Sequence, residues 1–558
     1  MTWANPFVDG SKELRIPERV ARGERLYADV VCHYGPVPNW LHAGAYRALG
    51  YRFTTPLALL VPLSALVFLS LFLLARKAGG VEAAAWGTAW GLTLALVAPN
   101  GGALVLPYSY AGTHALAFAT LGLLLSLSER RGALAAAAAC WALALASKQE
   151  YAVASIGASL LANAVGRPLL RPVRPRVALA AAGGALGGVG LFAWALRGLS
   201  LPSLAPDGPL ILFGIPPEWR TLFRLVAGLD DPAGSARAVA TSALLVLLLL
   251  ALVEGAGRLE ERLARGDSAR AALLRGACGA ALLAAVAFFL AAPLGRELDR
   301  ALPPLLAAGP PAAAAAAVLA VLRGKEAGPA ARARVALLGF AALVSSRVFL
   351  HVTYGWVATP FTAFAAPALA AAAAVAAFAR PGRRRVYVAL ALGALVLLQA
   401  GRTFLQTDPE LFAAVETPAG ALRLPAGKAG AVRDALSFLA HASRPGDGLV
   451  GFPEAGLFNF VLGLSNPMKL EQYLPGSLDA GGEARFARKL REAGPRWVVL
   501  PNQPTSLFGA VAFGRDYARD VEDVIEERYR PRAQFGDAAP EEPVGSPRFF
   551  LRVLERVP

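Results

Sequence analysis

Long apolar runs constrain this chain more than any other feature of its sequence. From Pro56 to Gln399 they follow one another at about 17 to 21 residues each, which is enough for a helix to cross the core of a bilayer. Only 17% of the residues are charged, fewer than in an ordinary soluble protein. We therefore predict a mainly α-helical, polytopic membrane protein. About twelve transmembrane helices are expected, near residues 56–75, 82–98, 111–127, 133–147, 151–165, 177–196, 236–253, 272–292, 304–322, 335–350, 361–379 and 386–400.

Basic residues in the loops between these runs predict the orientation of the chain. Every second loop is rich in Lys and Arg, as at Arg76 and Lys77, whereas loop 99–112 has neither. Because cytoplasmic loops carry the excess of positive charge, the basic loops are expected inside and residues 1–55 and 401–558 outside. The net charge of +16 is then a signal of topology, and it does not indicate a nucleic-acid partner.

The same pattern predicts three domains: an outer active-site segment 1–55, a membrane domain 56–400 and an outer C-terminal domain 401–558. In the last, short apolar runs alternate with amphipathic stretches, as is typical of a small α/β domain. Strands are expected at 448–452, 496–501 and 548–555, and helices at 429–442, 483–493 and 515–527. An outer segment normally follows an export signal or a membrane helix, so a further, thirteenth helix is expected upstream of Met1.

Polar residues at the outer ends of the predicted helices are the candidates for a functional site, because ionisable groups in a membrane are costly and usually functional. All of them fall on one predicted face of the membrane: Asp9, Lys12, Glu13, Asp29, Tyr34, Tyr108, Tyr110, His114, Lys148, Glu150, Asp207, Arg220, Arg347, His351 and Tyr354. No His, Asp and Glu cluster has the spacing of a tight metal site. The cysteines Cys32, Cys140 and Cys278 form neither a metal-ligand pattern nor a disulfide framework.

Several of these candidates have a purely structural alternative. Asp9 is also an ordinary residue for a helix N-cap or an Asx-turn. Lys148 and Glu150 are placed where interfacial anchors reach toward water. Arg347 and His351 are four residues apart, as in a simple polar pair on one helix face.

Short motifs along the chain resemble one known family. The stretches "ARGERLYADV" at 21–30 and "GPVPNWLHA" at 35–43 resemble the first outer loop of GT-C superfamily glycosyltransferases, which include the protein O-mannosyltransferases and the lipid A aminoarabinose transferases. "SKQEY" at 147–151 is similar to a Lys-containing helix end of that family, and "SSRVFLHVTYGW" at 345–356 to its late Arg/His segment. Residues 451–476, "GFPEAGLFNFVLGLSNPMKLEQYLPG", resemble the outer C-terminal domain of bacterial members.

The resemblance implies that a hexosyl or pentosyl unit passes from a polyprenyl-phosphate donor to a glycan, lipid or protein acceptor at the outer face of the bacterial inner membrane. The expected partners are therefore this lipid-linked donor, membrane lipids and the acceptor, without nucleic acid. Asp9 is implied as the catalytic base. The implied donor-phosphate ligands are Lys148, Arg347 and His351, and the implied substrate-binding residues are Tyr34, Tyr108, Tyr110 and Glu150.

One loop departs from the family pattern. Many relatives have a second acidic residue between their third and fourth helices, but loop 99–110 has none. More of the expected chemistry therefore depends on Asp9, and the sequence leaves open whether a divalent metal takes part.

Two functions of other classes stay open at this stage. A secondary transporter is also polytopic, but the helices show few internal charges and no paired halves with broken helices. A non-catalytic membrane component of envelope glycan assembly is the other alternative. Consumption of a lipid-linked sugar in vitro separates the three.

Overall fold

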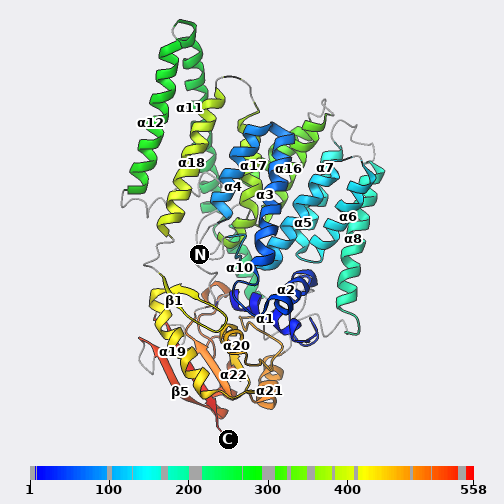
Figure 1. Cartoon of the computed structure of the whole chain (residues 1–558), viewed down its shortest axis with the longest axis vertical. Coiled ribbons are helices and arrows are strands. Elements are labelled where there is room, and N and C mark those ends of the chain that lie inside the picture. Colours follow the sequence, from blue (N-terminus) through cyan, green and yellow to red (C-terminus); the bar gives the residue numbers. More distant parts are fainter. Residues whose placement is uncertain are drawn as a thin grey trace.

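The computed structural model describes most of the chain: residues 7, 9–96, 103–128, 130–164, 174–199, 217–266, 268–291, 308–322, 328–348, 359–379, 382, 384–406, 412–477, 482–503, 505–537 and 548–557. Figure 1 shows two parts, a bundle of long helices and a smaller domain of strands and helices. Two short helices near the N-terminus lie between them.

Each predicted apolar run coincides with a helix of the bundle. These helices are α3 (Leu57–Gly79), α4 (Val81–Ala95), α5 (Tyr110–Ser126), α6 (Arg131–Leu145), α7 (Gln149–Ala164), α8 (Pro175–Ala195), α11 (Pro232–Gly266), α12 (Ser268–Ala291), α15 (Gly309–Leu322), α16 (Pro329–Val344), α17 (Thr359–Ala377) and α18 (Arg384–Gln406). Within the described residues, 5 helical segments are long and apolar enough to cross a membrane. The protein is therefore a helical membrane protein, and the number of its spans stays a prediction.

Two helix boundaries differ from those predicted. α11 has 35 residues and continues well past the predicted end at 253, because its polar second half is stabilised by pairs such as Arg258 with Glu254, whose Nε and Oε1 lie 3.0 Å apart. α16 ends at Val344, before the predicted end at 350. Arg347 therefore lies in the short 3-10 turn η2 (Ser346–Val348) and not on a regular helix face.

Small residues let the helices of the bundle approach closely. A Cβ at Gly87 of α4 would lie 2.9 Å from the Ala371 Cα of α17, and one at Gly184 of α8 would lie 2.9 Å from the Ala138 carbonyl oxygen of α6. Such contacts between helices replace the hydrophobic effect that lipid does not provide. The Ala-rich composition is thus a packing feature of the bundle.

The C-terminal domain is built on a four-stranded sheet in the order β3-β4-β6-β5. β3 (Leu449–Gly451) and β4 (Trp497–Pro501) are parallel, whereas β6 (Phe550–Arg556) pairs antiparallel with β4 and with β5 (Tyr529–Gly536). The predicted strands coincide with β3, β4 and β6, and the predicted helices with α19 (Ala426–Ala442), α21 (Glu483–Ala493) and α22 (Arg519–Arg528). The hairpin of β1 (Phe412–Val415) and β2 (Leu422–Pro425), the strand β5 and the helix α20 (Gly456–Leu462) were not predicted.

The predicted N-terminal loop contains two helices, α1 (Gly10–Ala21) and α2 (Pro36–Leu49). Both lie between the bundle and the C-terminal domain (Figure 1). Their apolar residues share one core with that domain, in which Leu14 and Tyr46 belong with Phe458 and Val499. The N-terminal segment thus packs as part of the junction between the two larger regions.

Candidate functional site

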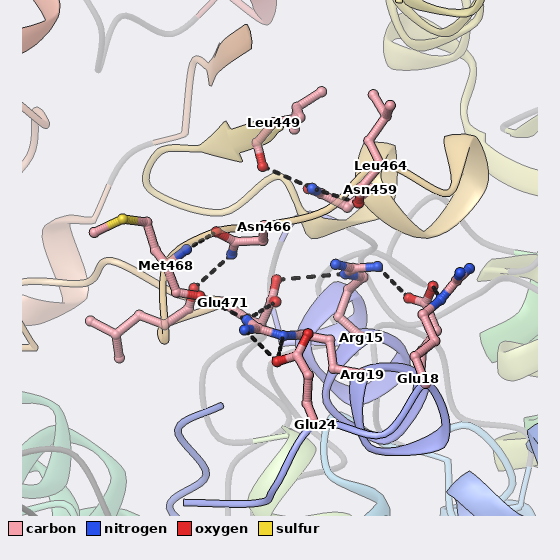
Figure 2. A network of polar contacts seen from close by, with 12 residues as sticks. Arg15, Glu18, Arg19, Glu24, Leu449, Asn459, Leu464, Asn466, Met468 and Glu471 are labelled. Atoms are coloured by element: carbon pink, nitrogen blue, oxygen red, sulfur yellow. Dashed lines mark hydrogen bonds and ion pairs between the residues drawn. The ribbon is translucent and has the colours of Figure 1, made fainter. Parts of the chain in front are cut away.

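α1 is a charged helix whose twelve residues are all buried. Burying a charge is costly unless it is paired. The charged side chains of α1 are paired, either with one another or with the C-terminal domain. Arg15 and Arg22 both contact Glu18, and Arg22 Nε lies 2.9 Å from Glu18 Oε1. Arg19 donates from Nη1 to Glu471 Oε1 of the C-terminal domain at 2.8 Å (Figure 2). The pairs with Glu18 neutralise charge within α1, and the contact with Glu471 holds the helix against that domain.

The segment that receives Arg19 is shaped by Asn466. The Asn466 Oδ1 accepts the Met468 backbone N–H at 2.9 Å, and its Nδ2 donates to the Leu470 carbonyl at 2.8 Å (Figure 2). Asn and Asp side chains form such local turns because they reach their own following backbone. The turn fixes the chain directly before Glu471 and Gln472, and so brings both side chains to α1.

Asp9, Lys12, Gln472 and Glu454 form one hydrogen-bonded group, which we call the Asp9 centre. Lys12 Nζ donates to Asp9 Oδ1 and to Gln472 Oε1, each at 2.8 Å. Gln472 Nε2 donates to Asp9 Oδ1 and to Glu454 Oε1, each at 3.0 Å. The Asp9 side chain is 27% exposed, so it is reachable from outside the protein. This centre joins the start of α1 to two separate segments of the C-terminal domain.

Asp9 occupies the N-cap position of α1, where its carbonyl accepts the Glu13 N–H at 3.0 Å. Its side chain, however, makes no capping hydrogen bond to the helix. Its φ of 54° lies in a region that residues other than glycine rarely adopt. Such backbone strain is found mostly where the surrounding structure holds a functional group in place. The geometry therefore favours a functional role over the capping alternative.

Burial and charge act in opposite directions on the Asp9 centre. Burial raises the pKa of Asp9, but the charge of Lys12 and the hydrogen bonds from Lys12 and Gln472 bring it below its usual value. Burial raises the pKa of Glu454 to about 8, and the nearby charge of Asp9 adds to this effect. The pKa values of these two neighbouring carboxyls thus differ widely, and Asp9 is the ionised member of the pair at neutral pH.

A second group of charges adjoins this centre through Tyr34. The Tyr34 ring centroid lies 5.7 Å from Lys12 Nζ and 4.8 Å from Lys148 Nζ. Lys148 Nζ also donates to the Tyr108 hydroxyl at 3.0 Å. One aromatic ring therefore lies beside both ammonium groups, as expected where cations are held against aromatic faces.

Glu150 links the two cations of this second group. Its Oε1 lies 3.7 Å from Lys148 Nζ and 3.7 Å from Arg347 Nη1. The Arg347 guanidinium carbon lies 5.2 Å from the ring centroid of Phe223, on α10 (Pro217–Ala227). We call Lys148, Glu150 and Arg347 the cation group.

Main-chain hydrogen bonds hold Tyr34 and Lys148 in register. The Gly35 N–H donates to the Ser147 carbonyl at 2.9 Å, and the Val37 N–H donates to the Ala146 carbonyl at 3.1 Å. The fit is close, because a Cβ at Gly35 would lie 2.0 Å from the Ala146 carbonyl oxygen. The start of α2 is therefore pinned to the turn that carries Lys148.

The structure brings together six of the eight residues predicted for the site: Asp9, Tyr34, Tyr108, Lys148, Glu150 and Arg347. Tyr110 lies to one side, where its ring centroid is 4.7 Å from that of His42 and its N–H donates to Glu13 Oε2 at 2.7 Å. His351 lies outside the described residues. The role of each residue stays a prediction.

Sequence reasoning missed the contribution of the C-terminal domain. Glu454 and Gln472 had one weak signal in the sequence, since both lie in the stretch 451–476 that resembles the outer domain of bacterial family members. His33 was also missed, although it is half-buried beside this centre, where burial and the charge of Lys12 lower the pKa of its ring. Nothing in the sequence indicated that these residues meet Asp9, because more than 400 residues separate Asp9 from Glu454 and Gln472.

A small, open hollow adjoins the Asp9 centre. Lys12, Tyr34 and Gln472 form the wall shared with the centre. Glu13 and His42 lie on its other side, and burial raises the pKa of Glu13 to about 7. Both ring nitrogens of His42 are buried without a hydrogen-bond partner among the described residues. Polar groups that line a concave site next to a carboxylate are typical of a small-molecule binding site.

Metal binding was tested against the same geometry. In the part of the chain that the structure describes, no group of three or more His, Cys, Asp and Glu side chains is arranged to hold a metal ion. The Asp9 and Glu454 carboxylates accept hydrogen bonds from Lys12 and Gln472 instead. The donor set thus gives no positive support for a resident metal.

Comparison with protein-family models and with curated proteins gives no match. Among solved structures, ArnT from Cupriavidus metallidurans bound to undecaprenyl phosphate is 14% identical, with 99% of this chain and 94% of that chain covered and a TM-score of 0.42. The oligosaccharyltransferase AglB from Archaeoglobus fulgidus, in complex with an inhibitory peptide and a dolichol-phosphate, is 13% identical, with 99% and 70% covered and a TM-score of 0.48. Both belong to the GT-C superfamily that the sequence motifs resemble. At these identities and TM-scores the similarity carries no argument about activity, and the function is argued from the site itself.

Proposed function

We propose that this protein is a membrane glycosyltransferase that moves a sugar from a polyprenyl-phosphate donor to a hydroxyl of a glycan, lipid or protein acceptor. The observation that carries the proposal is the pairing of the Asp9 centre with the cation group across Tyr34, at the end of an apolar helix bundle. Transfer from a phosphate ester needs a base for the incoming hydroxyl and cations for the leaving phosphate. The two groups supply these, and the bundle offers an apolar path for a lipid chain.

Asp9 acts as the base. The acceptor oxygen attacks the anomeric carbon, its proton passes to the Asp9 carboxylate, and the bond between that carbon and the phosphate oxygen breaks. Both donors that reach Asp9 use Oδ1, so Oδ2 has no hydrogen-bond partner among the described residues and is available to the acceptor. A base in this position contributes about 10²–10⁴-fold to the rate.

Lys148 and Arg347 receive the leaving phosphate. As the sugar bond breaks, the lipid phosphate gains negative charge, and cations placed at that point stabilise the transition state. Glu150 lies 3.7 Å from each cation, so the gap between them matches an anionic group with several oxygens. The planar guanidinium of Arg347 suits bidentate phosphate binding, and Tyr34 and Tyr108 form the adjoining sugar-binding wall.

The site faces the outside of the cytoplasmic membrane of a bacterium under this proposal. The support is the alternation of basic loops, which places the ends of the helices next to α1 and the C-terminal domain on the side away from the cytoplasm. Cysteine labelling from outside tests this: cysteines at the exposed positions Leu49 and Arg491 should react in intact spheroplasts, and one at the exposed position Arg176 should not. Labelling in the opposite pattern would overturn the outer-face assignment.

The activity is tested on purified protein in lipid nanodiscs. We expect release of free polyprenyl phosphate from at least one member of a set of polyprenyl-phosphate hexoses and pentoses, detected by mass spectrometry. Membrane lipids and glycans from a deletion strain name the acceptor, which should lack one sugar and should restore turnover when it is added. A transporter would move the lipid-linked sugar without cleaving it, so intact donor in every reaction would reject the proposal.

A further inference from the structure

We propose that the C-terminal domain supplies two positioning residues for the transfer reaction, Gln472 and Glu454, which align Asp9 only while that domain is docked on α1. This inference rests on the glycosyltransferase function proposed above. It assigns a catalytic task to a domain whose own strands and helices carry no other candidate for chemistry among the described residues.

The Gln472 amide can take only one orientation. Its Nε2 donates both hydrogens, to Asp9 Oδ1 and Glu454 Oε1, while its Oε1 accepts from Lys12 Nζ. If the amide flipped, its oxygen would face the carboxylates and its NH₂ group would face an ammonium, which has no acceptor. The charges of the neighbours thus lock the amide, and the locked amide fixes the position of Oδ1.

This arrangement separates the two oxygens of Asp9. Lys12 and Gln472 both bind Oδ1, at 2.8 and 3.0 Å. With one oxygen held by two donors, the other oxygen is directed toward the acceptor side with little freedom to rotate. A misplaced catalytic group can cost about 10²-fold in rate, so orientation of this kind is worth as much as the presence of the base.

Glu454 holds the main chain of the same residue. Its Oε2 accepts the Asp9 backbone N–H at 3.0 Å. Asp9 needs such a contact, because its φ of 54° is costly for a residue with a side chain. Gln472 therefore orients the carboxylate, and Glu454 holds the backbone from which it extends.

Docking of the domain brings both residues to Asp9 at once. Glu471 precedes Gln472 and binds Arg19 of α1 at 2.8 Å, so the pair that docks the segment also delivers the amide (Figure 2). Phe7 and Phe458, whose ring centroids are 6.4 Å apart, join the same two regions next to Glu454. A protein whose C-terminal domain moves away loses the alignment of its base while all its membrane helices stay intact.

The test compares Gln472→Leu and Glu454→Leu with Asn459→Leu in purified full-length protein. Asn459 is a matched control, since its Nδ2 donates to the Leu449 and Leu464 carbonyls inside the same domain and does not reach Asp9. We expect kcat to fall about 10- to 100-fold in both centre variants, with KM for the lipid donor changed by less than about twofold. Asn459→Leu should lower stability but keep kcat per folded molecule.

A second measurement does not depend on turnover. Carbodiimide reacts with protonated carboxyls. Burial raises the pKa of Asp9, and Lys12, Gln472 and Lys148 together bring it below its usual value. Without the amide the pKa should rise, so Gln472→Leu should be labelled at Asp9 up to a higher pH than wild type. Mass spectrometry of the labelled peptide gives this profile.

The outcomes separate the two proposals. Loss of kcat together with a shifted labelling profile supports the positioning role. Wild-type kcat and an unchanged profile in Gln472→Leu would overturn it. If the wild type cleaves no donor while the labelling still shifts, the glycosyltransferase proposal fails and the alignment of Asp9 by the C-terminal domain stands.

Discussion

α1 and α21 are two charged helices of similar length that lie in opposite environments. All residues of α1 are buried, whereas only Ala487 and Leu490 of α21 are buried and its charges face water. The charges of α1 have fixed partners such as Glu471, while Arg491 of α21 pairs with Glu527 at 2.7 Å between side chains that are 44% and 49% exposed. The comparison teaches that charge in a sequence does not indicate exposure. Burying a charged helix costs free energy, and ion pairs such as that of Arg19 with Glu471 offset this cost.

The largest effect is expected at the partner of α1. Glu471→Ala removes the buried carboxylate that faces both Arg15 and Arg19, and a broken buried ion pair costs up to about 3–5 kcal/mol. Glu18 and Glu24 still lie beside the two arginines and reduce this cost. Limited proteolysis in increasing urea should show the C-terminal domain released at a much lower concentration than in wild type. Glu471→Gln keeps the shape and serves as the milder control. If Glu471→Ala releases the domain at the same urea concentration as wild type, the buried pairs of α1 contribute no more to stability than the exposed pairs of α21.

Asp9→Asn tests whether burial at α1 serves chemistry. The substitution keeps the size of the side chain and removes its basicity, so turnover should fall about 10²-fold or more, which is about 2.7 kcal/mol, while folding is retained. If Asp9 were only a cap, the cost would be about 1 kcal/mol or less in stability and turnover would stay near wild type. Release of polyprenyl phosphate by the purified variant measures this. Near-normal transfer would reject Asp9 as the base.

Arg347→Ala tests whether the cation group acts on the donor phosphate while Asp9 acts on the acceptor. Arg347 belongs to the cation group, which binds the donor phosphate and stabilises it as it leaves. Its loss should therefore lower kcat/KM for the lipid-phosphate donor at least about tenfold, or about 1.4 kcal/mol, with a higher KM as part of the effect. Arg347→Lys keeps the charge but not the bidentate geometry, so its use of the lipid-phosphate donor should lie between that of wild type and that of Arg347→Ala. A titration of donor at saturating acceptor distinguishes the effect from that of Asp9→Asn. A fall in kcat with unchanged KM would show that Arg347 acts only in the transition state.

The smallest effect is expected on α21. Arg491→Ala removes an exposed pair, which is worth about 0–1 kcal/mol, so stability should change by less than about 0.5 kcal/mol and turnover should not change. The same urea series and transfer assay measure both. A loss as large as that of Glu471→Ala would contradict the contrast between the two helices.

The sequence was informative where one physical signal decides the structure. The length of the apolar runs predicted the helices of the bundle. A short apolar run predicted β4 (Trp497–Pro501), because a run of this length and composition is typical of a fully buried strand. The N-terminal segment was misread as a loop, since the charges of α1 suggest solvent and only a distant partner explains their burial. α11 continued past its predicted end because its charged second half forms helical ion pairs, which a search for apolar runs does not detect. The end of α16 was misplaced because its Ala-rich sequence has no strong stop signal.

The candidate site divides in the same way. Lys148 was predicted because a charge next to an apolar run is conspicuous, and Asp9 because the N-terminal segment resembles the first outer loop of a known family. Gln472 was not, since an amide has no charge to stand out and its role comes from three neighbours that meet only in the folded chain. Local patterns therefore identified the reactive groups, and the residues that orient them required the tertiary structure.

The hydrogen bonds between Gly35 and the end of α6 have a consequence for how this protein can vary. The Ala146 and Ser147 carbonyls hold the start of α2, so that Tyr34 lies beside Lys148. Both residues are themselves fully buried, which limits the side chains that can replace them. Position 35 is more restricted still, since even a methyl group would collide with the Ala146 carbonyl. Mutational drift is thus restricted on both sides of this contact, where one hydrogen atom in place of a side chain keeps the two halves of the site together.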